Sequence, residues 1–209
     1  SCEYKSSTFF YLEDKKAGKP WITKLPFPVQ CVSKVNTNDK VAGTYFTNQY
    51  TYHHGYYDHI EREFRGFGRV DQIDTEDFEN FKLSNANNVV EEDLHQPPVK
   101  RVTWFYTGAF DRNENILKQF ATEYNKGPFE FDLIDPLLEG DIYPTEYREA
   151  FRACKSKILR EEVYAIDGSL SEDKPFTVSM HNCFMETKKK CLDGILLHMI
   201  VFCQPIHYL

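Results

Sequence analysis

The stretch that decides the fold is "YTYHHGYYDHIEREFRGFGRVDQ", from Tyr50 to Gln72. Aromatic residues alternate with polar ones in its first part, and glutamate alternates with arginine in its second part, which is typical of two β-strands. We place the turn between them at residues 55–58. Gly66 and Gly68 leave one face of the second strand bare, which permits a bulge, a bend or the close approach of an aromatic side chain. The stretch therefore predicts a strongly curved β-hairpin.

The rest of the chain extends this β pattern. Aromatic residues make up 15% of the 209 residues, and aromatic and β-branched side chains suit a pleated, half-buried surface. We expect strands over residues 2–12, 25–35, 44–54, 60–73, 98–110, 159–166, 175–186 and 194–209. An acidic and polar stretch over residues 71–98 interrupts the pattern, and we expect a surface loop there.

Two helices are predicted in the second half of the chain. Residues 113–124 place apolar side chains at helical spacing, with Asn113 as N-cap and Gly127 as terminator. Residues 144–158 do the same behind Thr145 as N-cap.

The predicted fold class is therefore mainly β with two short helical inserts (α+β), built on a curved antiparallel sheet. With no repeat and no clear linker, we divide the chain into a first β-rich part (1–95), a second β-rich part with the helices (96–185) and an apolar tail forming a truncated strand (186–209).

Charge and length limit the possible functions. The net charge is −7, and the only basic run is Lys188–Lys190, which disfavours nucleic-acid binding. The apolar run near the C-terminus is too short and interrupted for a membrane span. The chain opens with Ser-Cys-Glu-Tyr and has no leader-like segment, so we expect it to be a piece of a longer protein.

Histidines and acids in the hairpin raise the question of chemistry. In a regular strand His53 and His54 point to opposite faces, so they would not share one metal ion. His54 with Asp58 or His59 could converge across the turn, which leaves a metal-assisted hydrolase as an alternative, although no third ligand is evident.

Glutamates alternate with arginines after the turn. Glu61 and Glu63 could act as an acid-base pair, but this alternation favours cross-strand ion pairs with Arg62, Arg65 and Arg69.

The cysteines and the aromatic residues suggest two further kinds of site. The six cysteines show no framework spacing, so we predict thiols in the role of small apolar residues. A zinc site could be drawn from His181, Cys183, Cys191 and Cys203, but its spacing is poor.

The aromatic set Tyr50, Tyr52, Tyr56, Tyr57, Trp104 and Tyr106 could form a sugar-binding platform, although such stripes more often form the packed face of a sheet. We predict no catalytic, cofactor-binding or metal-binding residue and no cofactor.

Several long phrases carry a family resemblance. "STFFYLEDKKAGKPWITKLPFPVQCV", "EREFRGFG", "WFYTGAF", "YREAFRACKSKILREEVYAIDGS" and "PFTVSMHN" resemble, in this order, the middle region (mid-N/mid-C) of the B component of bacterial insecticidal toxin complexes (Tc toxins, SpvB/TcdB-type proteins). The resemblance runs from about Tyr4 to about Asn182 and fades from Glu186 onward. His59 and Ser156 stand at positions where the family commonly has glycine.

The resemblance implies a structural role. In this family the middle region lies between a β-propeller and the RHS repeats, and the B and C components form a hollow shell around a toxic enzyme. It implies a noncatalytic shell segment, made in the bacterial cytoplasm and then secreted. Its partners would be the propeller and RHS segments, the C component and, indirectly, the A-component pore. The alternative is a free-standing β-rich module that binds glycan or protein.

Overall fold

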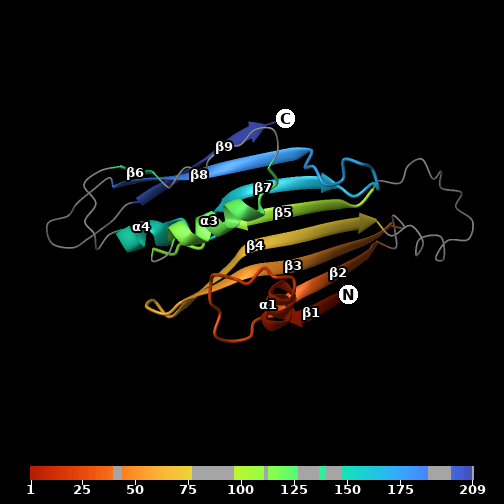
Figure 1. Cartoon of the computed structure of the whole chain (residues 1–209), viewed down its shortest axis with the longest axis horizontal. Coiled ribbons are helices and arrows are strands. Elements are labelled where there is room, and N and C mark those ends of the chain that lie inside the picture. The colour runs from red at the N-terminus through yellow and green to blue at the C-terminus, as the bar shows by residue number, and fades with distance from the viewer. Residues whose placement is uncertain are drawn as a thin grey trace, which may run out of the picture.

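The computed structural model describes residues 1–39, 44–76, 97–110, 113–126, 137–139, 147–187 and 199–208. Within these residues, nine strands form one sheet in the order β1-β2-β3-β4-β5-β7-β8-β6, and β9 also pairs with β8 (Figure 1). The strands are β1 (Cys2–Ser6), β2 (Gln30–Asp39), β3 (Thr44–Asp58), β4 (Glu63–Glu76), β5 (Val99–Phe105), β6 (Leu137–Glu139), β7 (Ile158–Ala165), β8 (Thr177–Thr187) and β9 (Met199–Tyr208). The predicted antiparallel sheet is confirmed, with one exception, because the short β6 runs parallel to β8.

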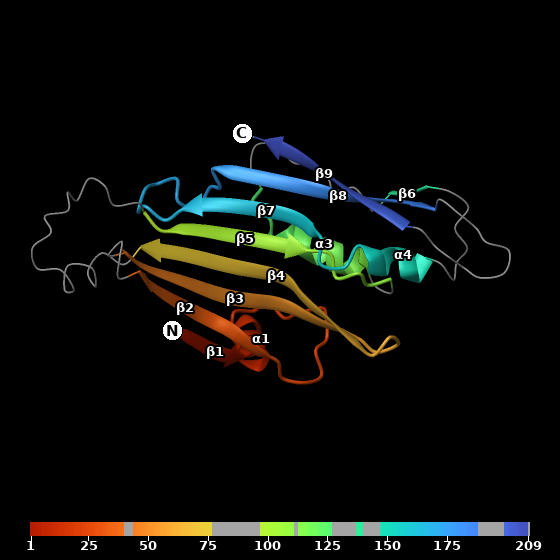
Figure 2. The same ribbon diagram turned by 180° about the vertical axis from the view of Figure 1, so that it is seen from behind.

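The described helices are α1 (Ser7–Lys16), α3 (Asn113–Glu123) and α4 (Tyr147–Ala153). In Figure 1 α3 lies in front of the central strands and α1 lies beside β1 and β2. Seen from behind, the strands pass in front of both helices (Figure 2). These two helices therefore lie on the same side of the sheet.

The sheet joins all three parts into which we divided the sequence. Strands β1 to β4 come from the first part and β5 to β7 from the second. Strand β8 begins in the second part and runs two residues past the boundary at 185, and β9, in the predicted apolar tail, pairs along β8 from Val178 to Thr187. On its other edge, β8 pairs first with β7 and then with β6. The domain boundaries at residues 95 and 185 stay a prediction.

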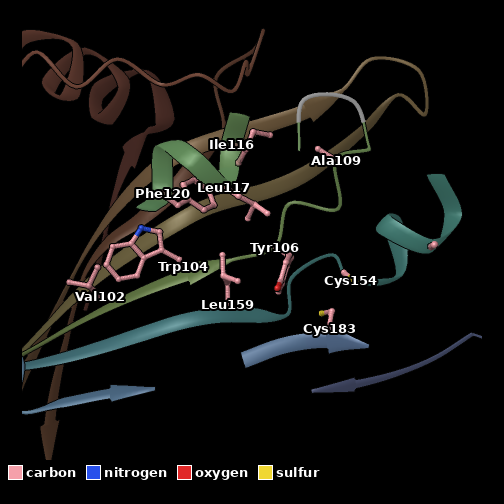
Figure 3. Packing of buried hydrophobic residues seen from close by; sticks show 11 residues of the cluster. Val102, Trp104, Tyr106, Ala109, Ile116, Leu117, Phe120, Cys154, Leu159 and Cys183 are labelled. Carbon is pink, nitrogen blue, oxygen red and sulfur yellow. The ribbon is translucent and has the colours of Figure 1, made fainter. Parts of the chain in front are cut away.

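The main core lies between α3 and strands β5 and β7. Its buried residues are Val102, Trp104, Tyr106, Ala109, Ile116, Leu117, Phe120, Ala150, Cys154, Leu159 and Cys183 (Figure 3). The helical spacing of Ile116, Leu117 and Phe120 places these side chains on the face that packs against the sheet. The predicted helix at residues 113–124 is thus confirmed, with Asn113 as its first residue; Gly127 lies outside the described residues.

The first predicted strand is wrong beyond Ser6. Helix α1 begins at Ser7, and the hydroxyl of Ser6 accepts a hydrogen bond from the backbone N–H of Thr8 at 3.3 Å. Serine at this position stabilises a helix N-terminus because it satisfies a backbone donor that has no partner within the helix. The charged residues that follow the predicted strand form the end of this helix. The described part of the chain therefore has a third helix in addition to the two predicted.

The central hairpin is longer than predicted. Strand β3 continues through the expected turn to Asp58, and the turn lies at residues 59–62. Oδ1 of Asp58 accepts hydrogen bonds from the backbone N–H groups of Ile60 (3.0 Å) and Glu61 (3.1 Å), which fixes this turn. Arg62 completes it in the left-handed region with a φ of 54°.

The second predicted helix ends early. Helix α4 stops at Ala153, and Ile158 begins strand β7 rather than ending the helix. Ser156 adopts a φ of 63° between them, a left-handed conformation that ends helical geometry. The predicted N-cap Thr145 lies outside the described residues. The strands predicted at residues 159–166 and 175–186 are confirmed as β7 and β8, which pair antiparallel.

In the part of the chain that the structure describes, none of the helices combines the length and the apolar character that a membrane crossing requires.

Candidate functional site

A left-handed residue in β3 brings two histidines to the same side of the sheet. His54 has a φ of 56°, which breaks the alternation of side chains expected for a regular strand. Nδ1 of His53 lies 2.6 Å from Asp14 of α1, and Nε2 of His54 lies 2.7 Å from Glu123 of α3. The prediction that the two imidazoles point to opposite faces is therefore wrong.

Gly68 makes room for this arrangement on the neighbouring strand. A Cβ atom at Gly68 would lie 2.5 Å from Cζ of Phe120 and 3.1 Å from Cβ of His54. The bare face that we inferred from the paired glycines thus receives an aromatic side chain, which comes from α3. Gly66 serves a different purpose, since its φ of +88° lies in the region that favours glycine.

The α1 side of the site is a three-residue contact. Oδ2 of Asp14 accepts a 2.5 Å hydrogen bond from Nε1 of Trp21 and lies 2.6 Å from Nδ1 of His53. Burial raises the pKa of Asp14, but the hydrogen bonds from His53 and Trp21 and the charges of both histidines bring it below its usual value. The contact attaches α1 and the loop after it to β3.

The α3 side is a larger network. Arg69 of β4 forms two 2.7 Å hydrogen bonds to Asp71 and a 3.1 Å bond to Glu123. Lys100 of β5 lies 3.7 Å from Asp71. Burial raises the pKa of Glu123, but His54 and Arg69 outweigh it and lower the pKa to about 2. Burial lowers the pKa of Arg69, but the carboxylates of Asp71 and Glu123 outweigh this effect and raise it above its usual value. We call Asp14, His53, His54, Arg69, Asp71, Lys100 and Glu123 the charged cluster.

A cleft of about 1070 Å³ opens beside the charged cluster. Arg69 and Lys100 from the sheet, Glu123 from α3 and the exposed Leu170 from the loop after β7 line part of it. The charged groups among these lining residues already pair within the cluster. The geometry of the charged cluster suits the attachment of α1 and α3 to the sheet.

The structure separates the residues of the metal-site alternative. Asp58 binds Arg65, at 2.9 Å, while His54 binds Glu123 and His59 is exposed. Among the described residues, no three His, Cys, Asp or Glu side chains form an arrangement that could hold a metal ion. The pairing of His54 with Asp58 is therefore wrong.

The two glutamates after the turn form ion pairs, as expected, but with other partners in addition to those predicted. Glu63 lies 2.7 Å from Lys155 and 3.0 Å from Arg65, and Glu61 lies 3.8 Å from Arg148. Lys155 and Arg148 come from the second half of the chain. These pairs tie the hairpin tip to α4 and the segment that follows it.

The aromatic and cysteine candidates lie mostly in the interior of the protein. Trp104 and Tyr106 are only 1% and 3% exposed, and Tyr52 packs on Phe10 and Phe67, so these aromatics cannot stack on a sugar. Cys183 is buried in the core, opposite Cys203 in the β8–β9 register. The four-residue zinc hypothesis is untested, because Cys191 lies outside the described residues.

Sequence reasoning missed the carboxylates of the charged cluster. Asp14 follows the strand predicted at residues 2–12 and was not assigned to a helix, and Asp71 was placed at the start of the polar stretch. A signal for Glu123 was present, since it lies three residues after Phe120 and hence on the same side of the helix.

Comparison with known proteins finds a family match in the first part of the chain. Residues 1–93 match the family described as the insecticide toxin TcdB middle/N-terminal region. The resemblance predicted from the sequence is thus confirmed. No curated protein matches the chain at a significant level.

Solved structures extend this likeness to the whole chain. The crystal structure of TcdB2-TccC3 without its hypervariable C-terminal region matches with a TM-score of 0.75 and 25% identity, over 99% of this chain and 10% of that one. A Tc holotoxin pore from Photorhabdus luminescens matches with a TM-score of 0.71 and 25% identity, over 99% of this chain and 9% of that one. The chain is therefore similar to a middle region of the Tc toxin B component, and it spans about a tenth of the proteins it matches.

Proposed function

We propose that the chain is a noncatalytic wall segment of the shell that encloses the toxic enzyme in a Tc toxin. The observation that carries this proposal is the likeness to TcdB2-TccC3, which extends over 99% of the chain. A large sheet with helices attached to it suits a wall, because the backbone hydrogen bonds of nine strands make a continuous layer. A rounded wall also needs curved strands, which bulges and glycines supply.

The charged residues support a structural role rather than catalysis. His54, Asp58 and Glu63 are among the residues that the sequence marked as candidates for chemistry. Each bonds to a residue of another element or loop: His54 to Glu123, Asp58 to Arg65 and Glu63 to Lys155. The pairs of His54 with Glu123 and of Asp58 with Arg65 are buried. Such pairs fix the relative positions of elements, because removing either partner leaves a buried charge without compensation.

A wall segment of this kind would have defined partners and a defined place of action. The partners are the propeller and RHS segments of the B component, the C component and, through the B component, the A-component pore. The matched structures contain TccC3 or form a holotoxin pore. The chain would be made in the bacterial cytoplasm and act after secretion as part of the toxin complex.

A hybrid complex tests the proposal. The region of TcdB2 that matches this chain is replaced by it in TcdB2-TccC3, and protease resistance of the enclosed TccC3 C-terminal region is measured. We expect resistance close to that of the parent complex. The same hybrid with Trp104→Ala should lose resistance through its weakened core, whereas Glu13→Gln on the exposed face of α1 should retain it. A hybrid that assembles but leaves the TccC3 region open to protease contradicts the proposal.

A further inference from the structure

A groove of about 530 Å³ lies between α1 and the loop that follows it, and residues 21–28 form its second wall. The walls are joined near the start of α1, where the backbone N–H of Ser7 donates to the carbonyl of Val29 at 2.8 Å and the N–H of Val29 donates to Oγ of Ser7 at 2.9 Å. They are joined again near its end, where Nε1 of Trp21 donates to Oδ2 of Asp14 at 2.5 Å. The groove is therefore preformed, which lowers the entropic cost of binding.

The groove is mostly apolar and has exposed apolar side chains on both rims. Tyr11 of α1 packs edge-on against Trp21, with 5.4 Å between the ring centroids, and Phe27 with two prolines lines the opposite wall. Phe27 is 40% exposed. Leu12, one helical turn after Thr8 of the groove wall, is 46% exposed. Apolar surface that gathers around a groove in this way is typical of an interaction site.

The polar groups of the groove indicate the chemistry of an occupant. Thr23 is only 6% exposed, and its Oγ1 has no hydrogen-bond partner among the described residues. A partner for this buried hydroxyl would stabilise the complex, since an unsatisfied polar group costs free energy. Lys24 also lines the groove, is exposed and forms no ion pair within the described part of the chain.

The charge of the groove differs from that of the chain. The chain has 32 acidic residues and a net charge of −7, yet none of the described residues that line the groove carries a carboxylate. The nearby carboxylate of Asp14 is already bound by Trp21 and His53. Charge complementarity therefore favours an acidic occupant over a basic one.

We propose that this groove binds an extended segment of the B component from outside the chain, which presents an apolar side chain next to an aspartate or glutamate. The apolar side chain packs between Leu12 and Phe27, the carboxylate pairs with Lys24, and a polar group of the segment bonds to Thr23. The chain spans about a tenth of the proteins it matches, so the rest of such a protein can supply the segment. The inference rests on the proposed function, because a segment of the same polypeptide is held near the groove at high effective concentration.

Photo-cross-linking in the TcdB2-TccC3 hybrid tests the proposal. Benzoylphenylalanine replaces Leu12 on the rim, and in the control it replaces Phe9, which is similarly exposed at 44% but does not line the groove. After irradiation, mass spectrometry of the Leu12 variant should identify a TcdB2 peptide from outside the replaced region, with an acidic residue beside an apolar one. The Phe9 variant should not capture this peptide. Capture of TccC3, capture of a second copy of the chain, or no capture in an assembled hybrid overturns the proposal.

A hybrid that does not assemble would count against the proposed function, and a peptide array then decides on the groove alone. Short overlapping peptides that cover TcdB2 outside the replaced region are probed with the labelled 209-residue chain. We expect binding to peptides with an apolar residue beside Asp or Glu. Lys24→Glu should weaken this binding about tenfold by like-charge repulsion, whereas Lys174→Glu, at an exposed lysine between β7 and β8, should leave it unchanged. In that case, no binding or equal binding by the Lys24→Glu variant overturns the proposal.

Discussion

Oδ2 of Asp58 accepts a 2.9 Å hydrogen bond from Nη2 of Arg65, whose side chain is completely buried. Nη1 of the same guanidinium donates to the carbonyl of Gly108 at 2.9 Å. A buried arginine thus joins the hairpin turn, strand β4 and the segment after β5. The two halves of the chain are held together at this point.

Removing Asp58 should therefore destabilise the fold strongly. We expect Asp58→Ala to lower the free energy of unfolding by about 3–5 kcal/mol, because Arg65 would remain as a buried charge with one carboxylate fewer. Urea unfolding measures the loss. The double variant Asp58→Ala with Arg65→Met should lose less than the sum of the two single variants. Additive losses would mean that the pair is not coupled.

Gly68 should tolerate no side chain while Phe120 is present. A Cβ atom there would lie 2.5 Å from the Phe120 ring, so Gly68→Ala should cost about 1–3 kcal/mol by overpacking. Phe120→Leu removes the ring atom concerned, and the double variant should recover part of the cost of Gly68→Ala. If Gly68→Ala costs the same in both backgrounds, the close approach does not explain the glycine.

Ser156→Gly should stabilise the chain. Ser156 has a φ of 63°, and a non-glycine residue in this left-handed region destabilises the folded state by about 1–2 kcal/mol. Glycine removes this strain, but it loses more conformational entropy on folding, which offsets part of the gain. A gain of about 0.5–1 kcal/mol in urea unfolding is expected. Ser179→Gly, in strand β8, should instead destabilise. A loss of stability in Ser156→Gly would show that the serine makes a compensating contact.

Glu123 should contribute to acid denaturation. Its pKa is about 2 in the folded chain against 4.5 ordinarily. Because the folded-state pKa is lowered, its contribution of about 3 kcal/mol is present above pH 4.5 and is lost as the pH falls towards 2. Urea unfolding between pH 7 and pH 2.5 should show a shallower pH dependence in Glu123→Gln than in the wild type. Glu3→Gln, in exposed β1, is the control and should leave the pH dependence unchanged.

Most strands could be predicted because alternation is a local signal. The hairpin of β3 and β4, the pairing of β7 with β8 and helix α3 follow from the period of their apolar residues. Helix α1 was missed because "STFFYL" reads as a strand when its N-cap, Ser6, is not recognised. Aromatic residues favour strands as a group, but here the cap and the packing of Phe10 determine the helix.

The charged cluster could be predicted only in part. The histidines were singled out, but their shared side depends on the φ of 56° at His54. His54 lies against Phe120 of α3 and beside Gly68 of β4, which are distant from it in sequence. The partners Asp14 and Glu123 could not be assigned without the positions of their helices. Long-range ion pairs of this kind have no local sequence signal.

Electron cryomicroscopy of the TcdB2-TccC3 hybrid containing this chain tests the wall role most directly. The account predicts that the sheet from β1 to β9 lies within a closed wall around an internal cavity, with the β3–β4 hairpin joined to its neighbours as in the chain described here. A hybrid in which this sheet lies outside an intact shell, or in which it is attached as a separate domain, would contradict the account.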